Sequence, residues 1–192
     1  MVHGPAQLIR HMRIIGGKFK GRRFYPPAGN WPTRPTTDFA KEGLFNILNN
    51  RIDFEQVKML DLFGGTGNHS YEFISRGCTQ VTYVDKFPAC VAFVKKIASD
   101  LGISNYIRIV KADVFRFLDT DTGRYDYIFA GPPYALPRID EIPGLVLQRG
   151  LLNTGGLLVL EHDPNHSFRN HPEFVEERNY GKTIFSFFAD RS

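Results

Sequence analysis

Asp61 lies near the end of an apolar segment, Lys58–Phe63, that runs into a glycine-rich turn, Gly64-Gly65-Thr66-Gly67. Glycine adopts positive φ and has no Cβ, so such a turn can bring a ligand against backbone amides. A helix predicted from Asn68 to Ser75 would direct its positive dipole end at the same place. The acid would repel a pyrophosphate, so the segment predicts a site for a ligand with a cationic group. Taken alone, the turn is equally compatible with an ordinary strand-to-helix loop.

Two further acids follow predicted strands, Asp85 after Gln80–Val84 and Asp113 after Tyr106–Lys111. Asp85 lies 24 residues after Asp61, the separation expected of a carboxylate that holds two ribose hydroxyls. Asp113 is placed where it could bind an adenine amine. Single acids often cap such loops, but that explanation accounts poorly for three at successive strand ends. Because open α/β sheets bind ligands at the carboxyl ends of their strands, the pattern predicts a nucleoside site.

A fourth strand, predicted over Tyr125–Ala130, runs into Gly131-Pro132-Pro133-Tyr134. A rigid aromatic side chain after two prolines could stack on a base that has swung out of its helix, or it could simply fill a crevice. Glu161 ends a later predicted strand, Gly156–Leu160, and is a further acid at this edge of the sheet.

The charge of the chain is unevenly distributed. Residues 1–37 hold seven basic side chains and no acid, which leaves 24 − 7 = 17 basic and 20 acidic residues in the remainder. Phe19, Phe24, Tyr25 and Trp31 are interleaved with the charges as surfaces on which bases could stack. A solvated hairpin is the plainer interpretation, but the one-sided charge favours RNA binding.

We expect one α/β domain, because 192 residues with 42% hydrophobic content can bury one such core but not two. A basic hairpin, Met12–Ile15 with Arg22–Tyr25, is predicted to precede it, followed by a proline-rich connector. Thr36 or Thr37 should cap a helix whose Phe39, Gly43, Leu44, Ile47 and Leu48 face the sheet. Later predicted elements are helices from Pro88 and around Arg138–Arg149, and a closing antiparallel strand, Lys182–Phe188. Seven strands are expected in the sheet.

The order of these blocks resembles the class I S-adenosylmethionine-dependent methyltransferases, and among them the bacterial small-subunit ribosomal RNA guanine-N2 methyltransferases. The resemblance extends from Met12 to the C-terminus. It rests on four groups of residues: Met12–Lys18 with Gly21-Arg22-Arg23, Thr33–Asp38, Asp61–Gly67, and Pro132-Pro133-Tyr134. Together these blocks are far more specific than any one of them.

The resemblance implies a Rossmann-like seven-stranded sheet with helices on both faces, S-adenosylmethionine as cofactor, and 16S rRNA or a small-subunit assembly particle as partner. It implies residues 1–11 as a flexible extension, 12–37 as the basic arm and 38–192 as the methyltransferase domain. Expected cofactor-binding residues are Arg34, Thr36, Asp61, Phe63, Gly64, Gly65, Thr66, Gly67, Asp85, Lys86, Asp113 and Val114. Expected RNA-binding residues are Arg13, Lys18, Lys20, Arg22, Arg23 and Arg34, and expected catalytic residues are Gly131, Pro132, Pro133 and Tyr134.

One position departs from the resemblance. The family has Asp before Pro-Pro-Tyr, and amine methyltransferases more widely have Asp or Asn, whereas this chain has Gly131. Without that acceptor, an exocyclic amine retains only the Pro132 carbonyl from this motif, so the protein is slow or silent, or another group or a water orients the amine. On this basis Gly131→Asp is expected to raise the methylation rate about a hundredfold.

Three alternative functions remain open. An adenine-N6 or other amine methyltransferase would share the domain but not the basic arm. A catalytically silent RNA-binding or assembly protein is favoured by Gly131. A nicotinamide oxidoreductase is disfavoured, because Ser70 replaces the third glycine of its fingerprint.

Composition adds several expectations. Only Cys78 and Cys90 are present, which indicates a reduced cytoplasmic protein rather than a disulfide scaffold. No apolar run approaches a membrane span. His162, His166 and His171 match no zinc spacing, so a solvated loop is expected there and no metal. His69 is expected to be exposed, and the protein to be a monomer.

Overall fold

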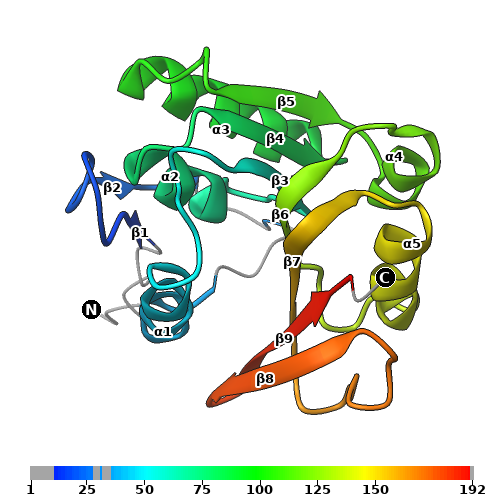
Figure 1. Cartoon of the computed structure of the whole chain (residues 1–192). Coiled ribbons are helices and arrows are strands. Elements are labelled where there is room, and N and C mark those ends of the chain that lie inside the picture. Colours follow the sequence, from blue (N-terminus) through cyan, green and yellow to red (C-terminus); the bar gives the residue numbers. More distant parts are fainter. Residues whose placement is uncertain (1–10, 28–30, 32–35, 191–192) are drawn as a thin grey trace, which may run out of the picture.

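The computed structural model describes residues 11–27, 31 and 36–190. Its centre is a seven-stranded sheet with the strand order β5-β4-β3-β6-β7-β9-β8, shown in Figure 1. The strands are β3 (Lys58–Leu62), β4 (Gln80–Asp85), β5 (Ile107–Lys111), β6 (Tyr125–Ala130), β7 (Leu152–His162), β8 (Phe174–Tyr180) and β9 (Thr183–Ala189). The first five are parallel, and β9 pairs antiparallel with both β7 and β8. The predicted seven-stranded α/β sheet and its antiparallel closing strand are confirmed.

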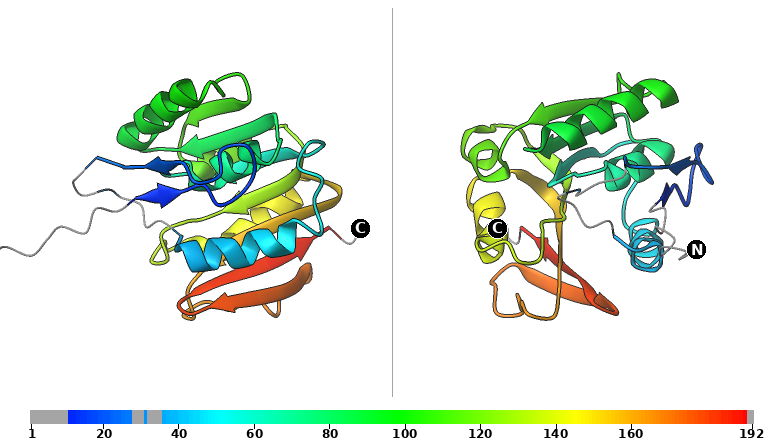
Figure 2. Two further views of the ribbon diagram at one scale, coloured as in Figure 1. Left: turned by 90° about the vertical axis from the view of Figure 1, so that its left-hand side faces the viewer. Right: turned by 180° about the vertical axis from the view of Figure 1, so that it is seen from behind.

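Two apolar clusters lie on opposite faces of the sheet. Met59 of β3 belongs to one cluster, and its neighbours Leu60 and Leu62 belong to the other. Side chains of one face pack against α1 (Asp38–Leu48), α2 (Asn68–Ser75) and α3 (Pro88–Leu101). Those of the other face pack against α4 (Val114–Thr120) and α5 (Ile142–Gln148), which follows a short 3-10 helix, η1 (Ile139–Glu141). The left view of Figure 2 faces the layer of α1, α2 and α3, and the right view shows the two helical layers on either side of the sheet. Because both faces are covered, the central strands are apolar almost throughout.

The chain reverses direction across the sheet between β3 and β6. From β3 it winds outward through β4 to β5, then returns to place β6 on the other side of β3. In open α/β sheets this switch point is where the carboxyl ends of strands leave a crevice for a ligand. The topology therefore places the ends of β3, β4, β6 and β7 around one crevice.

The predicted basic hairpin is present and is shorter than expected. Strands β1 (Met12–Arg13) and β2 (Arg23–Phe24) pair antiparallel, and two backbone hydrogen bonds extend the pairing to Ile14. Met12, Ile14 and Phe24 are buried in the cluster that also contains α1 and α2. The hairpin therefore shares the core of the sheet rather than standing apart from it.

The packing face of α1 was predicted in part: Leu44 and Leu48 are buried as expected, and Ile47 is partly buried against the same cluster. Helix α1 begins after Thr37, as predicted, but it buries Ala40, Lys41, Leu44, Phe45 and Leu48, while Phe39 is 67% exposed. The buried face of α1 is displaced from the predicted one because it includes Lys41, and apolar periodicity cannot indicate a buried lysine. Strand β8 was not placed by the sequence, since its alternation of charged residues resembles a loop.

Among the described residues, no helix is both long and apolar enough to cross a bilayer.

Candidate active site

One cavity lies at the switch point, and most of the predicted site residues line it. These are Thr36, Asp61, Phe63, Gly64, Gly65, Thr66, Asp85, Lys86, Asp113, Val114, Gly131, Pro132, Pro133 and Tyr134. Gly67 does not line the cavity but shapes the turn beneath it, and Arg34 lies outside the described residues. The structure thus brings together residues that are up to 98 positions apart between Thr36 and Tyr134.

The glycine-rich turn is required mainly by packing beneath the site. A Cβ on Gly64 would lie 2.3 Å from the ring of Tyr83, whose hydroxyl donates to the Gly65 carbonyl at 2.5 Å. Gly67 has φ +82° and caps α2 in the left-handed conformation. Phe63 is the non-glycine residue with positive φ, +58°, in the described chain. The positive φ predicted for this turn is found at Gly65 and Gly67, whereas Gly64 makes room for Tyr83.

Asp61 is buried under the turn, with 1% of its surface exposed. Its Oδ2 accepts a hydrogen bond of 2.6 Å from the Ser70 hydroxyl on α2. Burial raises the pKa of the carboxyl to about 7, against the opposing effect of the Ser70 hydrogen bonds. A cationic group beside this buried carboxyl would favour its charged form. Asp61 therefore fits the cationic ligand group that the sequence predicts.

Asp85 joins the turn to the end of β4. Its Oδ2 accepts from the Gly65 amide and its Oδ1 from the Phe87 amide, both at 2.9 Å. Burial raises the pKa of this carboxyl, and the backbone hydrogen bonds counteract that effect. The carboxylate is therefore held rigidly at the cavity wall, where a ligand with paired hydroxyls could reach it.

Asp113 caps the next helix, α4. Its Oδ1 accepts from the amides of Phe115 and Arg116 at 3.0 and 3.2 Å. The capping explanation considered for the acids is therefore correct for Asp113, which also lines the cavity. Capping and ligand contact are compatible, because a carboxylate has two oxygens.

The Pro-Pro-Tyr turn forms the opposite wall of the cavity. The Gly131 amide donates to the Leu62 carbonyl at 3.2 Å, which fixes the start of the turn beside β3. The hydroxyl of Tyr134 donates to Glu161 Oε1 at 3.0 Å and lies 3.2 Å from the Thr183 hydroxyl. Glu161 in turn accepts from the Thr36 hydroxyl through Oε2 at 2.9 Å. The sequence placed Glu161 at this edge but did not connect it to Tyr134.

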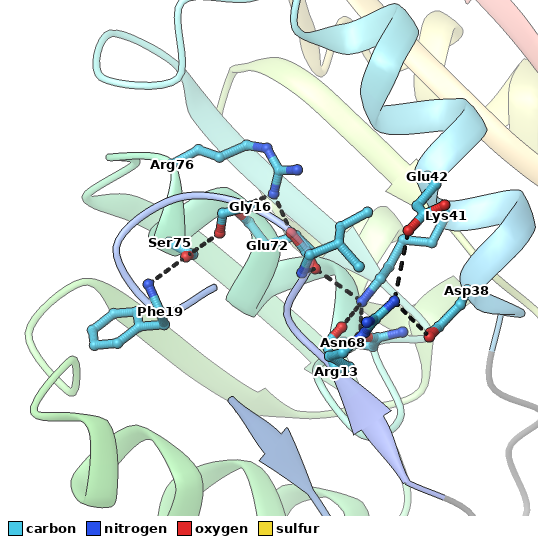
Figure 3. Close-up of polar contacts among 11 residues, drawn as sticks. Arg13, Gly16, Phe19, Asp38, Lys41, Glu42, Asn68, Glu72, Ser75 and Arg76 are labelled. Carbon is cyan, nitrogen blue, oxygen red and sulfur yellow. Dashed lines mark hydrogen bonds and ion pairs between the residues drawn. The ribbon is translucent and has the colours of Figure 1, made fainter. Parts of the chain in front are cut away.

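A buried ionic cluster fastens the hairpin to helices α1 and α2, as Figure 3 shows. Lys41 is 2% exposed, and its ammonium donates to Glu72 Oε1 at 2.9 Å, to the Arg13 carbonyl at 2.5 Å and to Asn68 Oδ1 at 2.8 Å. These three contacts match the three donors of an ammonium group. Burial lowers the pKa of Lys41, and Glu72 opposes that shift.

Glu72 of α2 is the centre of this cluster. It is fully buried, accepts from the Ile15 amide at 2.6 Å through Oε1, and pairs with Arg76 through Oε2. The next turn of α2 adds Ser75, whose hydroxyl donates to the Gly16 carbonyl at 2.6 Å and accepts from the Phe19 amide at 2.9 Å. The backbone of the hairpin is therefore anchored by side chains of α2.

Close packing also restricts the hairpin turn. Gly17 has φ +75°, and a Cβ there would lie 1.9 Å from the Ser75 carbonyl oxygen. Only glycine fits at this contact, which explains Gly17 in the sequence.

Four of the basic residues predicted to bind RNA, Lys18, Lys20, Arg22 and Arg23, are exposed. Arg13 differs, since its guanidinium lies 3.5 Å from Asp38 and 3.6 Å from Glu42 on α1. Among the aromatic residues, Tyr25 is 55% exposed. Phe24 is buried against Tyr71, so it was wrongly expected to offer a stacking surface. Trp31 is half-buried and packs edge-on against Phe93. The basic segment is too short for its sequence pattern to indicate which of its aromatic side chains are buried.

His69 was wrongly expected to be exposed. It is 7% exposed and stacks on Phe129, with the ring centroids 3.7 Å apart. Its Nε2 lies 3.0 Å from the Tyr127 hydroxyl, and burial lowers its pKa well below the ordinary value. Neutral His69 is therefore part of the cavity floor.

Further lining residues were not proposed from the sequence, namely Lys41, Leu44, Asn68, Phe87, Phe115, Phe129, Leu136 and Phe185. In the part of the chain that the structure describes, no three His, Cys, Asp or Glu side chains gather closely enough to hold a metal ion.

The sheet order, the glycine turn and the strand-end acids define the α/β fold of the class I S-adenosylmethionine-dependent methyltransferases. The chain belongs to the protein family described as Conserved hypothetical protein 95, whose pattern matches residues 12–189. This match covers the hairpin and the whole sheet.

Two relatives and one solved structure illustrate the match. A Bacillus subtilis (strain 168) protein, YlbH, provisionally named an rRNA methyltransferase, is 33% identical over 155 residues, 79% of this chain and 83% of its own. Ribosomal RNA small subunit methyltransferase D of Buchnera aphidicola subsp. Baizongia pistaciae is 29% identical over 155 residues, 81% and 78% of the two chains. The structure of Escherichia coli yhhF, provisionally described as a methyltransferase, superposes with a TM-score of 0.80 at 26% identity over 93% and 97% of the chains.

Proposed function

We propose that this protein is an S-adenosylmethionine-dependent rRNA methyltransferase that modifies the exocyclic N2 amine of a guanine in small-subunit RNA. The observation that carries the proposal is a single cavity that joins Asp61, Asp85 and Asp113 on one side to Pro132, Pro133 and Tyr134 on the other. The names of the rRNA-modifying relatives support the same substrate class.

The residues of the cavity fit the cofactor. Asp61 offers a buried carboxyl for an amino group, Asp85 a fixed carboxylate for ribose hydroxyls, and Asp113 an acceptor for an adenine amine. The bound cofactor supplies an electrophilic methyl group. The protein supplies binding and orientation, since these three acids would hold both ends of the molecule.

The opposite wall fits a flipped base. Tyr134 is half-buried and its ring follows two prolines, so it is held in a fixed place for stacking. The Pro132 carbonyl can accept one N–H of the guanine amine. That amine is a poor nucleophile because its lone pair is delocalised, so its orientation and the removal of a proton determine the rate.

The proposed function is tested by incubating the protein and S-adenosylmethionine with 16S RNA and with small-subunit particles, followed by digestion and identification of the methylated nucleoside. N2-methylguanosine is the expected product. A methylated adenosine would identify another amine methyltransferase. Specific RNA binding without any product would identify a silent RNA-binding protein.

Cofactor affinity should depend on the protonation of Asp61, whose pKa is about 7. A cationic amino group favours the charged carboxylate, so affinity should fall as the pH drops below about 7, approaching tenfold per pH unit. Calorimetry on wild type and Asp61→Asn at each pH measures this effect as the ratio of the two affinities, which cancels titration of the ligand. A constant ratio across that range would mean that Asp61 does not meet the amino group.

The exposed basic residues of the hairpin are expected to bind RNA phosphates. Changing Lys20, Arg22 and Arg23 to Ala should weaken binding and flatten the log-log salt dependence by up to about 0.7 per lost contact, leaving cofactor affinity unchanged. The matched control removes three exposed charges elsewhere, Lys95, Arg108 and Lys182. If both triple variants reduce the slope of the salt dependence equally, the hairpin is not the RNA-binding surface.

A further inference from the structure

Glu161 lies beside the position where the usual acceptor is missing. It occupies the end of β7, which pairs in parallel with β6 so that Leu160 is opposite Ala130. The next residue of each strand is therefore Glu161 on β7 and Gly131 after β6. Glu161 is 6% exposed and lines the same cavity as the Pro-Pro-Tyr turn.

The carboxylate of Glu161 adjoins the space that a side chain at residue 131 would enter. A Cβ built on Gly131 would lie 3.4 Å from Glu161 Oε2 and 3.0 Å from Phe129 Cε1. The first distance is an ordinary van der Waals contact, whereas the second is tight. A carboxylate contributed by β7 therefore stands next to the site of the absent aspartate.

Two hydroxyl groups orient the Glu161 carboxylate. Tyr134 donates to Oε1 at 3.0 Å and Thr36 donates to Oε2 at 2.9 Å. Each oxygen of a carboxylate can accept more than one hydrogen bond, so these contacts are compatible with a further contact to the substrate. The contact to Tyr134 also ties the acid to the aromatic ring on which the base would stack. An acceptor that is fixed before the substrate arrives is the kind that contributes most to catalysis.

We propose that Glu161, in place of residue 131, accepts an N–H of the substrate amine and receives its proton, an inference that rests on the proposed function. The amine nitrogen uses its lone pair to form the new N–C bond, while the C–S bond breaks and its electron pair stays on sulfur. The nitrogen then loses one proton to the Glu161 carboxylate, which passes it to water. Thr36 and Tyr134 act as positioning residues for this carboxylate.

With Glu161 as the acceptor, Gly131→Asp is expected to behave differently. A second carboxylate would be forced beside Glu161, where two like charges repel each other, and its Cβ would crowd Phe129. The single variant should therefore not gain the hundredfold rate expected from the sequence. In a Glu161→Ala background the same aspartate would stand alone, and it should restore part of the lost rate.

The experiment compares Glu161→Gln, Glu161→Ala and Gly131→Asp/Glu161→Ala with wild type. Glu177→Gln is the matched control, since Glu177 lies on β8 and pairs with exposed Arg169. Single-turnover methylation at saturating cofactor and RNA should fall about a hundredfold in Glu161→Gln and remain unchanged in the control. Calorimetry should show unchanged affinity for S-adenosylhomocysteine in both.

A second readout does not depend on turnover. An RNA oligonucleotide with guanine at the target should bind wild type more tightly than one with hypoxanthine, which lacks the 2-amino group, and Glu161→Ala should abolish this preference. A normal rate and an intact preference in the Glu161 variants would overturn the inference while leaving the proposed function in place. So would a slow variant that lost cofactor affinity in the same proportion, since that indicates a structural role. Methylation of a base other than guanine by wild type would overturn the proposed function, and this inference with it.

Discussion

Replacing Glu72 with alanine is expected to lower the free energy of unfolding by about 3–5 kcal/mol. The substitution leaves the Lys41 ammonium, 2% exposed, without its carboxylate partner, and it removes the acceptor of the Ile15 amide. An unpaired buried charge is among the few changes that cost this much. Urea denaturation measures the loss, and hydrogen exchange at the Ile15 amide reports whether the hairpin separates from α2.

Glu42→Ala is the matched control, because Glu42 lies on the same helix as Lys41 but is exposed and pairs loosely with Arg13 at 3.6 Å. Its expected cost is within about 1 kcal/mol. Similar losses in the two variants would show that the buried cluster has no special part in holding the hairpin. A large loss only for Glu72→Ala, with fast exchange at Ile15, would confirm that the hairpin is fastened by α2.

Asp85→Ala is expected to weaken the binding of S-adenosylmethionine by tenfold to a hundredfold. The variant removes the charged acceptor that we propose for the ribose, an interaction worth about 1.5–3 kcal/mol. It also removes the partner of the Gly65 amide, so the glycine turn loses its link to β4. Calorimetry with S-adenosylmethionine and with S-adenosylhomocysteine should show the same ratio for both ligands, because the ribose is common to them.

Asp100→Ala provides the control for this measurement. Asp100 is exposed near the C-terminal end of α3, where it pairs with Lys96 at 2.6 Å. It does not line the cavity. Its removal should leave the affinity unchanged. Equal affinities for the Asp85 and Asp100 variants would place the ribose elsewhere and would require a different assignment of the strand-end acids.

The sequence by itself determined the elements and the strand-end positions of the site. Apolar runs that end in Asp85, Asp113 or Gly131 predict parallel strands, and parallel strands must bring their carboxyl ends to one edge of the sheet. Asp61, Asp85 and the Pro-Pro-Tyr turn could therefore be assigned to one cavity before the fold was known. Helix α2 was predicted with its observed bounds because its glycine turn and apolar spacing are local signals.

Only the tertiary structure decided which polar residues meet inside the core. Lys41, Glu72 and Arg13 come from separate segments, and a buried ion pair has no periodicity that distinguishes it from surface charge. The same holds for His69, which looks like an exposed first-turn residue until the Phe129 ring is placed over it. The register of β6 against β7 places Glu161 beside Gly131. The sequence alone could not show that a carboxylate lies next to this glycine. Such contacts join residues distant in the chain, and their geometry exists only once the sheet has formed.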